Sequence, residues 1–136
     1  MFLKMYQVGQ YEERPWGSYK VLEVGTNYCK KEIIVQPGKI LSLQSHNYRK
    51  ECWIVKYGTL EVMVDTKQMI LNEGDSVEIS VGVLHCMANL SHIPCVVEEL
   101  QTGICKEDDI IRYADNYGRT NVEQCIHMYN ELKQKL

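Results

Sequence analysis

The chain has 136 residues, a length that suits one domain around a single hydrophobic core, and we expect residues 1–136 to form one domain. Its formal net charge of −3 leaves no basic excess to neutralise nucleic-acid phosphates, which argues against a nucleic-acid partner. Residues 1–10 contain no long apolar run, and no segment reaches the ~20 apolar residues that a membrane-spanning helix needs. We therefore expect a cytoplasmic protein with no membrane partner.

Six cysteines could suggest a disulfide framework or a zinc ribbon: Cys29, Cys52, Cys86, Cys95, Cys105 and Cys125. No two of them have the C-x-x-C spacing of a zinc ribbon. Without a secretory signal the thiols face a reducing compartment. We expect them to be reduced, and several of them to be small hydrophobic residues of the core.

Residues 18 to 101 read as short strands that turn residues separate. The strand-length segments are rich in Val, Ile, Tyr and Leu, and they are 18–24, 28–35, 40–44, 52–57, 60–66, 67–71, 76–79, 84–90 and 94–101. Many short strands with no helix between them indicate an all-β sandwich or barrel.

The last part of the chain has a helical period. Apolar residues recur there at helical spacing, with Glu and Lys between them: Val122, Cys125, Ile126, Tyr129 and Leu132. We expect an amphipathic helix over about residues 121–136 that packs on the barrel or on a partner subunit.

Two blocks of polar residues and glycines have a fixed spacing. The first block is Gly38, Gln44, His46, Glu51 and Gly58, and the second is Gly74, Ser80, Gly82, His85 and Asn89. These blocks resemble the two signatures of the cupin superfamily, G-x5-H-x-H-x3–4-E-x6-G and G-x5-P-x-G-x2-H-x3-N. Eight of the ten fixed positions match, and Gln44 and Ser80 depart. The resemblance implies a double-stranded β-helix, or jelly-roll barrel, over about residues 12–119.

The cupin resemblance also implies a bound divalent metal, with Gln44, His46, Glu51 and His85 as its ligands. Residues i and i+2 of a strand face the same side, so Gln44 and His46 can both point into a barrel. Zinc is our first expectation, and manganese, iron(II) or cobalt also suit these nitrogen and oxygen donors. The alternative for any one histidine is ordinary packing. His92 and His127 lie outside the pattern, and we expect them on the surface.

Three longer segments narrow the resemblance. RPWGSYKVLEV at 14–24, PGKILSLQSHNYRKECWIVKYGTLEV at 37–62 and ELQTGICKEDDIIRYADNYGR at 99–119 resemble the type II phosphomannose isomerases. That domain also forms the C-terminal part of bifunctional mannose-6-phosphate isomerase/mannose-1-phosphate guanylyltransferases. The resemblance implies a stand-alone isomerase that interconverts mannose 6-phosphate and fructose 6-phosphate through an enediol. We expect no guanylyltransferase domain, because these residues contain no Gly-rich phosphate loop.

This family resemblance assigns further roles. Glu99 is the candidate base, and Tyr48, which would alternate onto the face of His46, is a candidate donor. Arg112 and Arg119 would bind the phosphate or polarise the substrate; the alternative is that they pair with Asp108, Asp109 or Asp115. Arg49 and Lys50 are secondary candidates for phosphate binding. The alternative interpretation is that both side chains are simply solvated.

Two departures from the family pattern leave a second hypothesis open. Tyr48 and Cys52 stand where the family commonly has His. If that His moves the proton, the chain would be a non-catalytic, metal-dependent sugar-phosphate-binding cupin. A cupin dioxygenase is a third alternative. The arginines assigned to phosphate binding argue against it. We expect a homodimer in each case.

Overall fold

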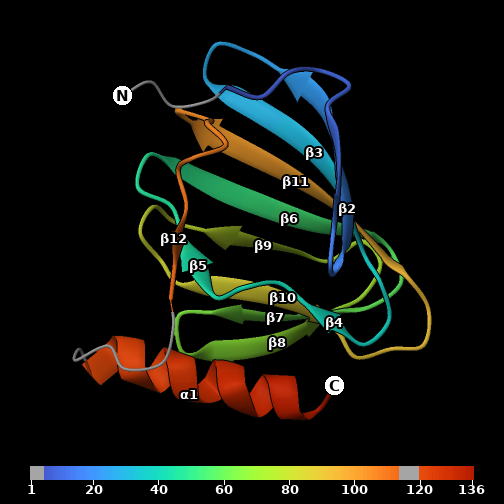
Figure 1. Cartoon of the computed structure of the whole chain (residues 1–136), viewed down its shortest axis with the longest axis vertical. Helices are drawn as coiled ribbons and strands as arrows, with labels where there is room; N and C mark the ends of the chain where they lie inside the picture. The colour runs from blue at the N-terminus through green and yellow to red at the C-terminus, as the bar shows by residue number, and fades with distance from the viewer. Residues whose placement is uncertain (1–4, 114–119) are drawn as a thin grey trace.

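The computed structural model describes residues 5–113 and 120–136. Two antiparallel sheets face each other, and one helix lies along the outer side of the second sheet (Figure 1). The first sheet has the order β1-β2-β3-β11-β6-β9. Its strands are β1 (Tyr11–Arg14), β2 (Gly17–Val24), β3 (Tyr28–Val35), β11 (Cys95–Gly103), β6 (Arg49–Tyr57) and β9 (Ser76–Ile79).

The second sheet has the order β12-β5-β10-β7-β8, and the short strand β4 also pairs with β10. Its strands are β12 (Ile111–Arg112), β5 (Gln44–Ser45), β10 (His85–Asn89), β7 (Leu60–Val64), β8 (Lys67–Leu71) and β4 (Lys39–Ile40). The expected strands are present, apart from the segment 40–44, and the all-β architecture is confirmed. β1 and β12 are additional strands that the sequence did not indicate.

The expected strand at 40–44 is broken into β4 and β5. Leu41 packs in the core between the two sheets, whereas Leu43 packs in a second core against the helix. Residues i and i+2 of a regular strand face the same side, so one continuous strand could not place both leucines. The break between β4 and β5 allows the two side chains to reach different cores.

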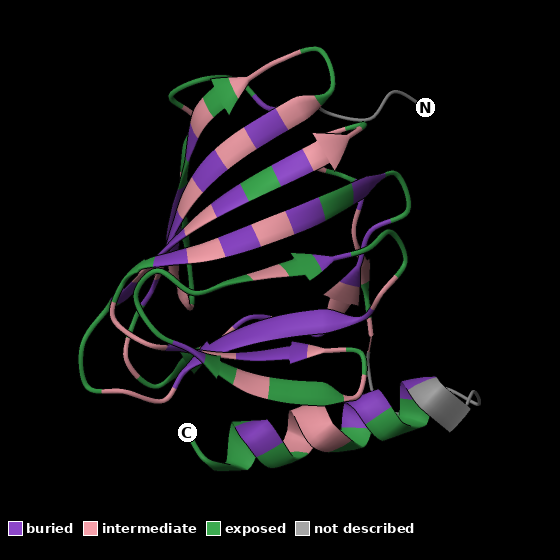
Figure 2. Ribbon diagram, turned by 180° about the vertical axis from the view of Figure 1, so that it is seen from behind, coloured by how far each residue is buried: buried purple, intermediate pink, exposed green. Residues whose placement is uncertain are grey.

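The main core lies between the sheets and follows strand alternation. Every second residue of β3 is buried, beginning with Cys29, and Trp53 and Val55 continue the core from β6. Figure 2 shows this alternation of buried and less buried positions along the strands of the first sheet. Trp53 was expected in this core, and that expectation is confirmed.

The helix α1 (Thr120–Gln134) covers the outer face of the second sheet. The predicted apolar positions Val122, Cys125, Ile126 and Leu132 are buried there. β10 is buried along its whole length, because its inner face lines the main core and its outer face meets the helix. The expected amphipathic helix is therefore confirmed, and it packs on its own barrel.

Within residues 5–113 and 120–136, no helix has the length and apolar character needed to cross a membrane. All six cysteines are free thiols. Three of them lie on strands and are buried in the main core or the second core: Cys29, Cys86 and Cys95. The structure contains a single copy of the chain, so the homodimer stays a prediction.

Asn89, the last residue of the second sequence block, ties three segments together. Its side chain is fully buried. The amide nitrogen donates to the carbonyl oxygens of Val35 at 2.9 Å and Ile93 at 2.7 Å. Its oxygen accepts from the backbone nitrogen and the hydroxyl of Ser91, at 2.9 and 2.7 Å. Asn89 therefore fixes the β10–β11 turn against the end of β3.

We expect Asn89→Ala to lower the free energy of unfolding by about 2 kcal/mol, because it leaves buried carbonyl groups unpaired. Equilibrium urea unfolding measures this change. Asn47→Ala is the control, since Asn47 is exposed. Equal stability of the two variants would contradict the role assigned to Asn89.

Candidate metal centre

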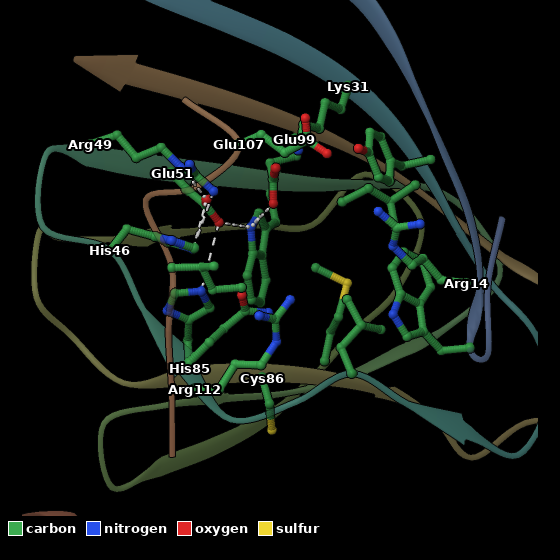
Figure 3. A pocket seen from close by; sticks show the side chains of 18 of the residues that line it. Arg14, Lys31, His46, Arg49, Glu51, His85, Cys86, Glu99, Glu107 and Arg112 are labelled. Atoms are coloured by element: carbon green, nitrogen blue, oxygen red, sulfur yellow. Dashed lines mark hydrogen bonds and ion pairs between the residues drawn. The ribbon is translucent and has the colours of Figure 1, made fainter. Parts of the chain in front are cut away.

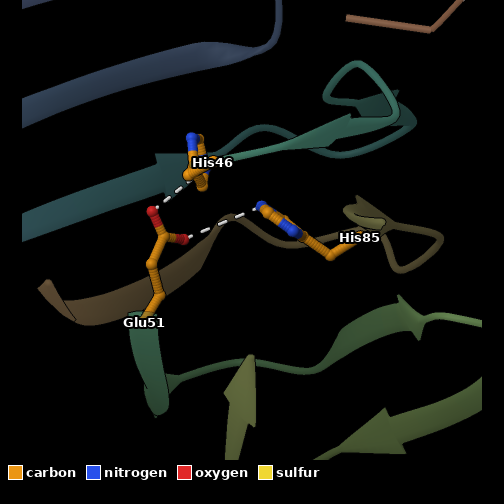
Figure 4. Close-up of side chains that lie close together, drawn as sticks. All are labelled: His46, Glu51 and His85. Carbon is orange, nitrogen blue, oxygen red and sulfur yellow. Dashed lines mark ion pairs between the residues drawn. The ribbon is translucent and has the colours of Figure 1, made fainter. Parts of the chain in front are cut away.

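Three of the four predicted ligands meet inside the barrel. His46 follows β5, Glu51 lies on β6, and His85 begins β10. Their ligand atoms all lie within 4.8 Å of one another (Figure 4). The exposed fractions are 4% for His46, 2% for Glu51 and 1% for His85. Among the described residues, this cluster of histidines and a carboxylate could hold a metal ion.

Backbone pairing brings the two sequence blocks together. His85 of β10 stands opposite Gln44 of β5 in the strand register. One turn earlier in the second block, the Gly82 nitrogen donates to the His46 carbonyl oxygen at 2.8 Å. Each block therefore contributes one histidine to the same end of the second sheet.

Hydrogen bonds orient both imidazole rings toward Glu51. His46 Nδ1 lies 2.6 Å from the Asp109 carbonyl oxygen, and His85 Nδ1 lies 2.9 Å from the Val83 carbonyl oxygen. A carbonyl oxygen only accepts, so each Nδ1 is the donor, and in a neutral ring Nε2 keeps its lone pair. Such backbone contacts are typical of metal-binding histidines.

The donor set fits a divalent cation. His85 Nε2 is buried and has no hydrogen-bond partner, and burial lowers the pKa of His85 to about 4, so the ring is neutral near pH 7. Burial raises the pKa of Glu51, but contacts with His46 and the Arg49 guanidinium hold it well below its usual range. Imidazole nitrogens and a carboxylate are the ligands that zinc and related metals use in proteins.

Gln44, the fourth predicted ligand, is half-buried and lines the same cavity. It stands between His85 on one side and Arg112 of β12 on the other. The strand register therefore places Gln44 next to His85 of the cluster. Its role as a metal ligand stays a prediction.

Glu51 is held from two further sides. Arg49 Nε donates to Glu51 Oε2 at 2.9 Å, and Trp53 Nε1 donates to Oε1 at 3.0 Å. Arg49 is buried, and its Nη1 also donates to the Lys106 carbonyl oxygen at 2.9 Å. The idea that Arg49 is simply solvated is therefore wrong, because its guanidinium neutralises Glu51. Lys50 is exposed and does not line the cavity.

The expectation that Tyr48 faces the pocket beside His46 is wrong. Strand alternation was the basis for that expectation, but β5 ends at Ser45 and the chain bends before β6 begins. Tyr48 is 54% exposed and is absent from the lining of the cavity. Asp109 fixes this bend, because its carboxylate accepts from the backbone nitrogens of Asn47 and Tyr48, both at 2.9 Å.

The cluster lies in the wall of a cavity of about 530 Å³ (Figure 3). Charged side chains of both signs line it together with aromatic rings. Glu99 of β11 is buried in this wall. Trp53 Nε1 donates to Glu99 Oε1 at 3.1 Å as well as to Glu51, and Gln101 Nε2 donates to Glu99 Oε2 at 2.8 Å. Burial and the neighbouring Glu51 charge raise the pKa of Glu99 to about 7.

Arg112 also lines the cavity. The suggested ion pair between Arg112 and Asp109 does not form, because the Asp109 carboxylate accepts from the backbone nitrogens of Asn47 and Tyr48 instead. Another partner considered, Asp115, lies outside the described residues together with Arg119, the second predicted phosphate arginine. His92 and His127 are exposed, as expected.

Sequence reasoning missed two cavity cations, Lys31 and Arg14. The signal for Lys31 was present in the strand pattern, since Lys31 shares its parity with the inward-facing residues Cys29, Ile33 and Val35 of β3. A charged residue on the buried side of a strand needs an explanation by a partner or a ligand. No comparable signal marked Arg14.

We expect His85→Ala to abolish stoichiometric metal binding, because it removes one of the two imidazole ligands while leaving the Arg49–Glu51 pair intact. Metal content per chain after loading with zinc and dialysis, measured by mass spectrometry, reports the loss. His92→Ala removes an exposed histidine and serves as control. Equal metal content in both variants would show that the cluster does not bind the ion.

Comparison with known proteins gives the family. The family model described as mannose-6-phosphate isomerase C-terminal matches residues 4–115. The mannose-1-phosphate guanylyltransferase of Escherichia coli is 42% identical over 107 residues, which are 78% of this chain and 22% of that protein. The alginate biosynthesis protein AlgA of Pseudomonas aeruginosa is 45% identical over 108 residues, 79% of this chain and 22% of that protein. The chain thus spans less than a quarter of the length of these relatives.

A solved structure confirms the fold. A sugar phosphate isomerase of the cupin superfamily from Silicibacter pomeroyi superposes with a TM-score of 0.55 at 18% sequence identity, covering 62% of this chain and 59% of that one. At this identity the similarity concerns the cupin barrel alone. With the family match over most of its length, the chain belongs to the mannose-6-phosphate isomerase C-terminal domain family.

Proposed function

We propose that this chain interconverts mannose 6-phosphate and fructose 6-phosphate as a metal-dependent isomerase. One observation carries the proposal: a single indole N–H, that of Trp53, bridges the Glu51 carboxylate of the metal cluster and the Glu99 carboxylate. A base therefore lies directly beside the cluster in a cavity large enough for a small sugar. Family membership supports the choice of substrate.

His46, Glu51 and His85, with Gln44 as the proposed fourth ligand, would hold the metal. We propose zinc first, with manganese, iron(II) and cobalt as alternatives for the same donors. When bound, a divalent metal supplies Lewis-acid polarisation of a substrate oxygen, which lowers the barrier to enolisation.

Glu99 is the proposed base that moves the proton between C2 and C1 of the substrate. Its pKa of about 7 suits a group that must accept and return a proton near neutral pH. Trp53 and Gln101 each hold one carboxylate oxygen of Glu99, which fixes the orientation of the base.

Arg112 is proposed to bind a substrate oxygen near the metal. It stands opposite Gln44 in the strand register and lines the cavity, and its guanidinium forms no ion pair with a carboxylate within the described part of the chain. A guanidinium in this position can donate two hydrogen bonds to a substrate oxygen or to a phosphate.

A second candidate is a metal-dependent sugar-phosphate-binding protein without catalysis. The exposed position of Tyr48 favours it, because the side chain that stands where the family commonly has His does not enter the pocket. Saturable binding of mannose 6-phosphate with no formation of fructose 6-phosphate would support this candidate over the isomerase.

A coupled assay for fructose 6-phosphate tests the proposed function on protein loaded separately with zinc, manganese, iron(II) and cobalt. We expect turnover of mannose 6-phosphate with at least one metal and none after chelation. Absence of turnover with all four metals, in protein that retains them, would refute the isomerase.

We expect Glu99→Gln to lower kcat about 100-fold or more, because general-base catalysis contributes at least that factor. Metal content should not change, since Glu99 is outside the ligand set. Glu98→Gln is the matched control: it makes the same change one residue earlier, where Glu98 pairs with Lys30 instead of lining the cavity. A Glu99→Gln variant with the kcat of the control would exclude Glu99 as the base.

A further inference from the structure

We infer that Lys31, clamped between Tyr6 and Tyr19 and assisted by Arg14, is the subsite for the phosphate group of the substrate. This inference rests on the proposed function, because it deepens the account of the same cavity. It places the phosphate at a different end of the cavity from Arg112.

Lys31 is a buried cation that aromatic rings surround. It is 6% exposed and faces the cavity from β3 (Figure 3). Its Nζ lies 3.9 Å from the centroid of the Tyr6 ring and 4.4 Å from that of the Tyr19 ring. The two rings pack edge to face, with centroids 6.4 Å apart. This clamp fixes the position of the ammonium group.

The ammonium group forms no ion pair in the described part of the chain, although Glu99 stands opposite Lys31 in the strand register and the Lys31 charge partly offsets the rise in the pKa of Glu99. Its Nζ contacts the two aromatic rings instead. Removing an ammonium group from water is costly, and aromatic faces offset only part of that cost. A ligand anion entering the cavity would supply a negative charge in direct contact with the ammonium group.

Two neighbouring groups add to the anion site. The Arg14 guanidinium carbon lies 5.6 Å from the Tyr19 ring centroid. The Tyr19 ring is therefore in contact with two cations, Arg14 and Lys31. Arg14 is exposed and pairs with Glu12 at 3.3 Å, which leaves further guanidinium donors. Burial, with a contribution from Glu107, raises the pKa of Tyr19 to about 12, so its hydroxyl keeps its proton and can donate to an oxyanion.

The position of this subsite suits the shape of the substrate. Figure 3 shows Lys31 and Arg14 on the side of the pocket away from His46, whereas Arg112 lies beside His85. In a hexose 6-phosphate the reacting carbons C1 and C2 and the phosphate on C6 are at opposite ends of the molecule. Lys31 stands opposite Glu99 in the strand register, and Figure 3 shows Glu99 between Glu51 and Lys31. C1 and C2 are then placed beside the metal cluster, and the phosphate beside the Lys31 ammonium group, with Glu99 between them.

Lys31→Met tests the inference, since it keeps the stem and removes the charge. The matched control is Lys30→Met, which removes a charge from the next residue of β3, where Lys30 pairs with Glu23 at 3.0 Å and Glu98 at 3.7 Å. Calorimetric titration of zinc-loaded protein with inorganic phosphate, mannose 6-phosphate and free mannose gives the affinities. Metal content and thermal unfolding are measured in parallel.

We expect Lys31→Met to weaken inorganic phosphate and mannose 6-phosphate about tenfold or more, the loss typical of one charge-assisted hydrogen bond. Free mannose binding and metal content should match the wild type, and Lys30→Met should change each affinity less than twofold. The midpoint of thermal unfolding should stay the same or rise, because the variant removes a desolvated charge.

Unchanged phosphate affinity in Lys31→Met would overturn the inference, as would an equal loss of mannose and mannose 6-phosphate. If that variant does not fold, Arg14→Gln decides: a loss of about threefold in phosphate affinity supports the subsite, and no loss overturns it. Lysine-dependent phosphate binding without any turnover would refute the isomerase and leave the subsite standing. If Lys31→Met turned over mannose 6-phosphate with an unchanged KM, the subsite would be refuted and the isomerase would stand.

Discussion

The site depends on one carboxylate, Glu51, held ionised inside the barrel. A buried anion is strongly unfavourable unless charges and donors surround it. Arg49 supplies the compensating charge, Trp53 supplies an N–H, and the two histidines complete the surroundings. Removing Arg49 or Trp53 takes away the charge or the donor that offsets burial of the anion, whereas the two imidazole Nε2 atoms face Glu51 as further ligand atoms for a cation.

The same arrangement connects structure to chemistry. The Trp53 indole joins Glu51 to Glu99, and the Glu51 charge is one reason that Glu99 binds its proton tightly. Polar groups in a core cost stability, and the apolar layers on either side compensate for that cost. One such layer lies between the sheets, and the other lies under the helix α1, which packs against the outer face of β10.

The local sequence pattern predicted most of the strands, and the resemblance to the cupin signatures predicted the barrel and three residues of the cluster. Predictions failed where long-range contacts decide. Tyr48 turns outward because Asp109, more than sixty residues along the chain, fixes the bend after β5. Arg49 is buried because its partner Glu51 is an anion in the core. The alternation of buried residues in β3 could have indicated that Lys31 faces inward. Its contact with Tyr6 could not be predicted in this way, because Tyr6 lies outside the strands.

The most direct test of the account is proton NMR of mannose 6-phosphate in D₂O with the metal-loaded chain. If Glu99 moves a proton through an enediol beside the metal cluster, deuterium enters C2 of mannose 6-phosphate and C1 of fructose 6-phosphate as the two interconvert. Retention of hydrogen at both carbons, with the metal bound and the sugar phosphate saturating, would contradict the account.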